Sequence, residues 1–194
     1  MTPLIVPLNR VRCARLCLLL ALAVMAASVA AQRAIADQDD PCGGFSWNVA
    51  RERALFAAAP QSIAAGRELK STPLLTPDRL YELQLGKQGQ VTMPLAPGRK
   101  SVGDAGYDGH ARYAGLARLQ LPRAGSYRIS LDQPAWIDLL ADGKMLDSSG
   151  FQGRPGCVAP HKIVQFTLPA GPELVLQFSA ATVPRLRVTI THAD

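Results

Sequence analysis

The segment LPRAGSYRISL, residues 121–131, carries the pattern that decides the fold class. A proline and a glycine open it, and Tyr127, Ile129 and Leu131 then alternate with two polar residues. A two-residue period is typical of a β-strand with one face in the core and the other in solvent. The proline and glycine in the short gap before it predict a hairpin turn from an antiparallel neighbour.

Seven other segments carry a related apolar pattern and predict further strands. They are residues 81–85, 90–95, 114–121, 135–140, 164–168, 174–178 and 186–190. A second proline-glycine gap at residues 169–171 predicts another hairpin turn, and Asp142-Gly143 predicts a third. About eight short strands with regular turn signals predict a mainly β fold, an antiparallel β-sandwich or jelly roll with a barrel as the alternative.

One helix is expected before the strands, near residues 47–59. Ser46 or Asn48 can cap its start, and Pro60 ends it. Apolar positions at three- and four-residue spacing predict the face that packs against the sheet. These positions are Trp47, Ala50, Ala54, Ala57 and Ala58.

The first 36 residues have the three parts of a cleaved secretory signal: arginines, an uncharged apolar run and small residues. Cleavage after Ala36 is favoured, and cleavage after Ala30 or Ala31 is the alternative. A retained membrane anchor would need roughly 20 apolar residues, and this run is shorter. We therefore expect a single domain of residues 37–194 in the periplasm or outside the cell, with no membrane span after cleavage.

Removing the signal changes the charge balance of the chain. Residues 1–36 contain four arginines and no acidic residue, so 17 of the 21 basic residues remain against 15 acidic residues. The remaining charge is spread along the chain and forms no basic stripe of the kind that phosphate contacts require. We therefore expect no nucleic-acid partner.

Two of the four cysteines, Cys42 and Cys157, lie beyond the signal. In an oxidising compartment an even pair favours a disulfide bond. Two separate thiols, or half of a metal site, are the alternatives.

Residues 97–115 and 147–160 are too irregular to predict strands, and their polar and aromatic side chains make them candidate binding loops. Trp136 could stack on a sugar ring, although a tryptophan that begins an apolar strand is more often part of the core. The candidate binding residues are Tyr107, Asp108, His110, Tyr113, Trp136 and His161.

A metal site is the sharpest chemical alternative. His110, His161 and Asp108 could supply the two histidines and one carboxylate that bind Fe(II) in non-haem oxygenases. However, the chain has no His-x-His pair, and it lacks the Gly-x-Ser-x-Gly motif of serine hydrolases. We therefore assign no catalytic residue and expect no cofactor.

Together with CGGFSW at residues 42–47, RERALF at residues 51–56 and WID at residues 136–138, the segment LPRAGSYRISL resembles a group of small exported proteobacterial proteins of unestablished function. The resemblance covers nearly all of the chain beyond the signal. Some members of this group are labelled homogentisate 1,2-dioxygenase, so the resemblance implies a non-haem Fe(II) dioxygenase as an alternative activity.

These patterns favour a binding or accessory module of the cell envelope that has no catalytic activity. Its two polar-aromatic loops suit a glycan, a peptide or a small ligand. The dioxygenase is the alternative, and a purely structural or inhibitory envelope protein is a third reading.

Overall fold

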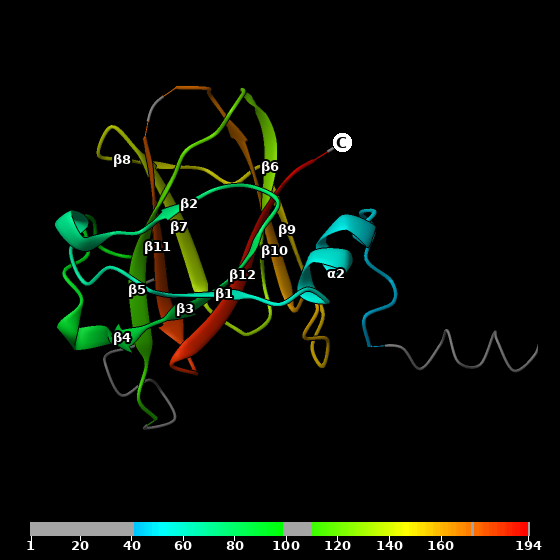
Figure 1. Ribbon diagram of the computed structural model, residues 1–194, viewed down its shortest axis with the longest axis horizontal. Helices are drawn as coiled ribbons and strands as arrows, with labels where there is room; N and C mark the ends of the chain where they lie inside the picture. Colours follow the sequence, from blue (N-terminus) through cyan, green and yellow to red (C-terminus); the bar gives the residue numbers. More distant parts are fainter. Residues whose placement is uncertain (1–40, 99–109, 172, 194) are drawn as a thin grey trace, which may run out of the picture. The chain divides into compact units, whose positions relative to one another are not determined.

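The computed structural model describes residues 41–98, 110–171 and 173–193. The chain divides into two compact units, Met1–Gly43 and Gly44–Asp194. The predicted signal peptide, residues 1–36, lies outside the described residues. The described part of the second unit is mainly β, with twelve strands in two mixed sheets and one α-helix, α2 (Figure 1).

Sheet A has six strands in the order β1-β3-β12-β6-β10-β9. Their bounds are β1 Gln61–Ala64, β3 Leu80–Gln84, β12 Arg185–His192, β6 Gly125–Leu131, β10 Lys162–Leu168 and β9 Gly150–Gly153. Sheet B follows the order β2-β5-β11-β7-β8, and β4 also pairs with β5. Its strands are β2 Leu74–Leu75, β5 Tyr113–Leu119, β11 Leu174–Ala181, β7 Trp136–Ala141, β8 Lys144–Leu146 and β4 Gly86–Lys87.

The prediction of a mainly β fold is confirmed, but the expected number of about eight strands is too low and not every strand pair is antiparallel. The pairs β1–β3 and β2–β5 are parallel, and the other pairs are antiparallel. Strands β1 and β2 have only four and two residues, too few to show a clear alternation in the sequence. The chain between β1 and β3 passes through β2 of the other sheet, a crossover of the kind that parallel pairing requires.

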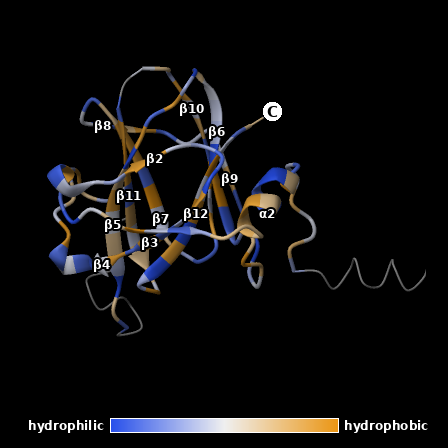
Figure 2. Ribbon diagram, viewed as in Figure 1, coloured by the Kyte–Doolittle hydropathy of each residue, from blue (hydrophilic) through white to orange (hydrophobic). Residues whose placement is uncertain are grey.

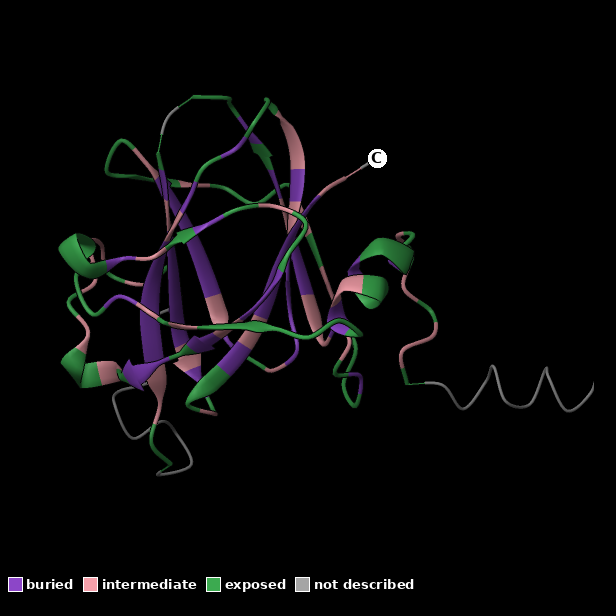
Figure 3. Ribbon diagram, viewed as in Figure 1, coloured by how far each residue is buried: buried purple, intermediate pink, exposed green. Residues whose placement is uncertain are grey.

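The alternation predicted for the periodic strands is confirmed by their burial. Leu83, Ile129, Phe166 and Val188 of sheet A are all almost fully buried, and they share one apolar cluster with residues of sheet B such as Phe178. Figure 2 shows hydrophobic residues along the strands of both sheets, and Figure 3 shows the buried residues concentrated there. Each such side chain contributes roughly 1.5–3 kcal/mol through burial.

Two predictions about the segments between regular strands are wrong. Residues 90–95 do not form a strand, because Pro94 interrupts the segment and the Leu95 backbone pairs instead with the Gln177 side chain, at 3.1 and 3.3 Å. Residues 147–160 are not entirely irregular, since they contain β9 at the edge of sheet A.

The proline-glycine gaps do not form the hairpins that the sequence predicts. Residues 120–124 connect β5 of sheet B to β6 of sheet A, and residues 169–173 connect β10 of sheet A to β11 of sheet B. Turn residues mark where the chain reverses, but they do not specify which sheet receives the next strand. The third prediction is confirmed: Asp142 and Gly143, with φ of 49° and 72°, join the antiparallel pair β7–β8, as a type I′ turn requires.

Helix α2, Ala50–Phe56, is shorter than predicted, and its buried face is different. The Asn48 side chain accepts a hydrogen bond from the Ala50 backbone N–H at 3.1 Å, but the N-cap residue is Val49 and no side chain caps it, so the predicted cap by Ser46 or Asn48 is wrong. The helix buries Glu52 and Phe56, whereas Ala50, Ala54, Ala57 and Ala58 are exposed. Phe56 offers far more apolar area than an alanine, and the Glu52 carboxylate finds polar partners beneath the helix (see below).

Cys42 and Cys157 are both disulfide-bonded, which confirms the predicted bridge. Cys157 is fully buried. Across residues 41–98, 110–171 and 173–193, no helix has the length and hydropathy needed to cross a membrane.

Candidate functional site

Of the six predicted binding residues, the structure describes four: His110, Tyr113, Trp136 and His161. Tyr107 and Asp108 lie outside the described residues. His110 is exposed, and Tyr113 is half-buried at the start of β5, where it pairs with Lys87 of β4. Of the predicted residues that the structure describes, Trp136 is the one that lines a substantial cleft.

This cleft lies where strands β7 and β8 of sheet B approach β9 and β10 of sheet A. We call it the edge cleft, because β8 and β9 are the last strands of their sheets. Its volume of about 430 Å³ falls within the usual range for small-molecule sites. The side chains used below are Trp136, Asp138, Met145, Phe151, Lys162 and Phe166.

A buried carboxylate fixes the indole of Trp136. Asp138 is only 5% exposed, and its Oδ1 accepts the indole N–H at 2.8 Å. Its Oδ2 accepts the backbone N–H of Gly98 at 3.1 Å. Both oxygens therefore have donors, as burial of a carboxylate requires.

The chain approaches Asp138 so closely at Gly98 that a side chain does not fit there. A β-carbon at this position would lie 2.9 Å from Asp138 Oδ1 and 3.2 Å from Met145 Sδ. Because Oδ1 is already bonded to the indole, it has little freedom to move. Glycine is therefore required to close this wall of the cleft.

An ammonium group lies on the face of the same indole. Lys162 Nζ is 5.0 Å from the centre of the Trp136 ring and donates a hydrogen bond to the Ala135 carbonyl oxygen at 2.9 Å. The half-buried Trp136 is thus held by a cation on its face and a carboxylate at its edge.

The remaining walls are largely apolar. Phe166 is buried, whereas Met145 on β8 and Phe151 on β9 are 36% and 74% exposed. A mostly apolar surface with a few fixed polar groups is typical of ligand pockets. The arrangement can therefore hold an apolar portion of a ligand and orient it through a small number of polar contacts.

The structure describes two of the three proposed metal ligands, His110 and His161. His161 Nδ1 lies 3.2 Å from the Cys157 carbonyl oxygen, so this ring nitrogen makes a local contact in its own loop. No group of three or more histidine, cysteine, aspartate or glutamate side chains among the described residues is placed to hold a metal ion. Because Asp108 lies outside those residues, the metal site stays a prediction.

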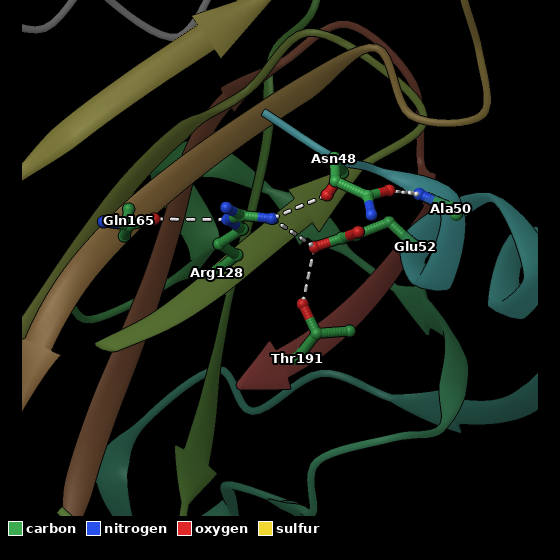
Figure 4. Close-up of polar contacts among 6 residues, drawn as sticks. All are labelled: Asn48, Ala50, Glu52, Arg128, Gln165 and Thr191. Carbon is green, nitrogen blue, oxygen red and sulfur yellow. Dashed lines mark hydrogen bonds and ion pairs between the residues drawn. The ribbon is translucent and has the colours of Figure 1, made fainter. Parts of the chain in front are cut away.

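Sequence reasoning missed a second polar site, which lies beside helix α2. Its cavity of about 430 Å³, here named the α2 cavity, is bordered by Trp47, Asn48, Glu52 and Arg128 among others. The buried carboxylate of Glu52 accepts a hydrogen bond from Thr191 at 2.7 Å and lies 3.5 Å from Arg128 (Figure 4). Arg128 occupies one of the polar positions of a periodic strand, and alternation with apolar residues predicts only that such a position faces solvent.

No family model matches the chain, and no curated protein matches its sequence.

Proposed function

We propose that this chain is an exported binding module without catalytic activity, and that the edge cleft holds an apolar portion of its ligand. The observation that carries the proposal is the exposure of Met145 and Phe151 beside the fixed indole of Trp136. An exposed phenylalanine next to an apolar cavity gains free energy when a ligand covers it, about 25 cal/mol for each Å² removed from water.

A β-sandwich of the jelly-roll kind forms part of this proposal. One cluster of buried side chains includes residues of both sheets, as expected for two sheets packed face to face. The chain also passes from one sheet to the other between β5 and β6 and between β10 and β11. Such crossings between sheets are typical of sandwich topologies.

Export to the periplasm or the medium agrees with the cysteine chemistry. Cys42 and Cys157 are disulfide-bonded, and disulfides persist in oxidising compartments. The predicted signal in residues 1–36 supplies the route.

The polar groups of the edge cleft support binding more than catalysis. Both oxygens of Asp138 accept hydrogen bonds, and Lys162 donates to a backbone carbonyl. These groups fix the wall of the cleft. A catalytic acid or base would instead face the reacting atoms of a substrate. The ligand classes that fit are a glycan, a peptide or a small molecule with an apolar part.

Tryptophan fluorescence can test the cleft, because the chain has only two tryptophans, Trp47 and Trp136. In the variant Trp47→Phe, all tryptophan emission comes from Trp136. We expect the amphipathic anionic dye 8-anilinonaphthalene-1-sulfonate to bind this variant through its aromatic rings and to accept excitation energy from Trp136. Adding Phe151→Ser should weaken dye binding about tenfold, because part of the burial energy of one phenylalanine is lost.

Leu69→Ser is the matched control, because Leu69 is also a large exposed apolar residue (50% exposed) and does not line the cleft. It should leave the dye affinity unchanged. A binding role for the edge cleft would be contradicted if the folded protein showed no energy transfer from Trp136 to the dye. It would also be contradicted if Phe151→Ser and Leu69→Ser lowered the dye affinity equally.

A further inference from the structure

From the α2 cavity we infer a second ligand site, independent of the edge cleft, that binds a neutral sugar ring. Four features carry this inference: a row of aligned residues across sheet A, a buried acceptor that lacks a donor, an arginine nitrogen that lacks an acceptor, and an aromatic ring at the same cavity.

Arg128, which lines the cavity, belongs to a row of residues that are opposite one another in register. Thr191 of β12 pairs with Arg128 of β6, Arg128 pairs with Gln165 of β10, and Gln165 pairs with Gly150 of β9. Paired residues project on the same face of a sheet, here the face opposite the shared apolar cluster. The row therefore places a hydroxyl, a guanidinium and an amide side by side.

The segment that leads into α2 lies over this row. A β-carbon on Gly150 would lie 3.2 Å from Trp47 Cζ2, so the indole rests where β9 has no side chain. Ser46 and Gln152 of β9 exchange two hydrogen bonds, at 2.9 and 2.6 Å. These contacts hold the Trp47 ring beside the cavity.

Glu52 provides an acceptor without a donor. The residue is 2% exposed, and its Oε1 accepts from Thr191 and faces Arg128. Its Oε2 has no hydrogen-bond partner within the described residues. A buried acceptor in this state is unfavourable, so a ligand hydroxyl that donates to Oε2 would remove an existing penalty.

Arg128 provides the complementary donor. Its Nε donates to Gln165 at 3.1 Å and its Nη1 donates to the Asn48 carbonyl at 2.9 Å (Figure 4). Its Nη2 makes no hydrogen bond to any described residue. The guanidinium also lies 4.9 Å from the centre of the Trp47 ring. These contacts fix the plane of the guanidinium, so Nη2 is positioned in advance for an acceptor.

The charges at the cavity favour a neutral ligand. Arg128 is paired with Glu52, and Arg51 is paired with Asp78 at 2.7 Å, so each arginine has its own counter-ion. A phosphate or carboxylate would compete with those acidic groups. A hydroxylated ring avoids this competition, because its hydroxyls can donate to Glu52 and accept from Arg128 while its C–H groups contact Trp47 beside the guanidinium.

The test uses the variant Trp136→Phe, in which Trp47 is the only tryptophan. Its binding to an array of neutral glycans is measured first. The hexose or N-acetylhexosamine at the end of each bound glycan is then titrated while Trp47 emission is recorded. We expect at least one such sugar to bind and to change this emission.

Two conservative variants then test the named contacts. Arg128→Lys keeps the positive charge beside Glu52 but loses the planar donor, and Glu52→Gln turns the Oε2 acceptor into an amide donor. Each should weaken sugar binding about tenfold or more, the loss expected for one hydrogen bond to a charged group. Arg118→Lys and Glu173→Gln are matched controls, because these residues form another arginine–glutamate pair at 3.2 Å outside the cavity.

If no neutral glycan binds the folded protein, the inference is wrong. It is also wrong if binding persists in both Arg128→Lys and Glu52→Gln. Melting temperatures of all four variants distinguish lost binding from lost folding. The dye assay on the edge cleft serves as a separate measurement, so failure of either site can be recognised without reference to the other.

Discussion

Replacing Arg128 with methionine should destabilise the fold by about 3 kcal/mol, because the substitution leaves the Glu52 charge buried with a single hydroxyl donor, Thr191. Loss of one partner of a buried ion pair costs about 3–5 kcal/mol. The lower end of this range applies here, since the Arg128 side chain is 11% exposed and water can partly replace it. Urea unfolding followed by far-ultraviolet circular dichroism, with the disulfide intact, measures this loss.

The double variant Arg128→Met with Glu52→Leu makes the prediction sharper. Apolar side chains of similar size often replace a buried ion pair without net cost, so the double variant should unfold within about 1 kcal/mol of the wild type. The two single variants would then be strongly non-additive, with a coupling free energy of at least about 2 kcal/mol.

Arg118→Met is the control for the loss of an arginine in a sheet, because the Arg118–Glu173 pair is 40% and 57% exposed. It should cost under about 1 kcal/mol. The reasoning about the buried pair would be refuted if Arg128→Met cost no more than this control. Strict additivity in the double variant would refute it equally.

Two further predictions concern the helix and the metal. Phe56→Ala should cost about 3 kcal/mol in urea unfolding, because Phe56 is 4% exposed, whereas Ala54→Gln on the exposed side of α2 should change stability by less than about 0.5 kcal/mol. Elemental analysis of protein purified without a His-tag or chelator should find iron far below one atom per chain. Stoichiometric iron would instead favour the dioxygenase alternative.

The sequence predicts well those parts of the fold in which the chemistry of a single residue decides its local structure or burial. Ile129 and Leu131 are fully buried, as their alternation predicts, because burial of large apolar side chains outweighs other local preferences. The Asp142-Gly143 hairpin is also predicted correctly, since both residues adopt the positive φ that this turn demands. Local chemistry suffices in these cases.

The missed features depend on partners that are distant in the sequence. Glu52 of α2 can be buried because its carboxylate meets Arg128 and Thr191, which lie 76 and 139 residues further along the chain. Without these partners the burial of Glu52 would be strongly unfavourable, so the sequence around α2 predicts that its alanines form the packed face. Asp138 is similar, because its donors include the backbone of Gly98, which is 40 residues away.

Alternation along β10 explains how two sites can lie close together and still act separately. Val164 and Phe166 face the edge cleft, whereas Gln165 between them accepts a hydrogen bond from Arg128, which lines the α2 cavity. The neighbouring strand β9 repeats the division, since Phe151 borders the cleft and Gly150 lies under Trp47. Because consecutive strand residues point to opposite faces, a side chain of β9 or β10 that borders one site cannot also border the other. Trp47 therefore reports on the α2 cavity and Trp136 on the edge cleft, and the two binding proposals depend on different side chains.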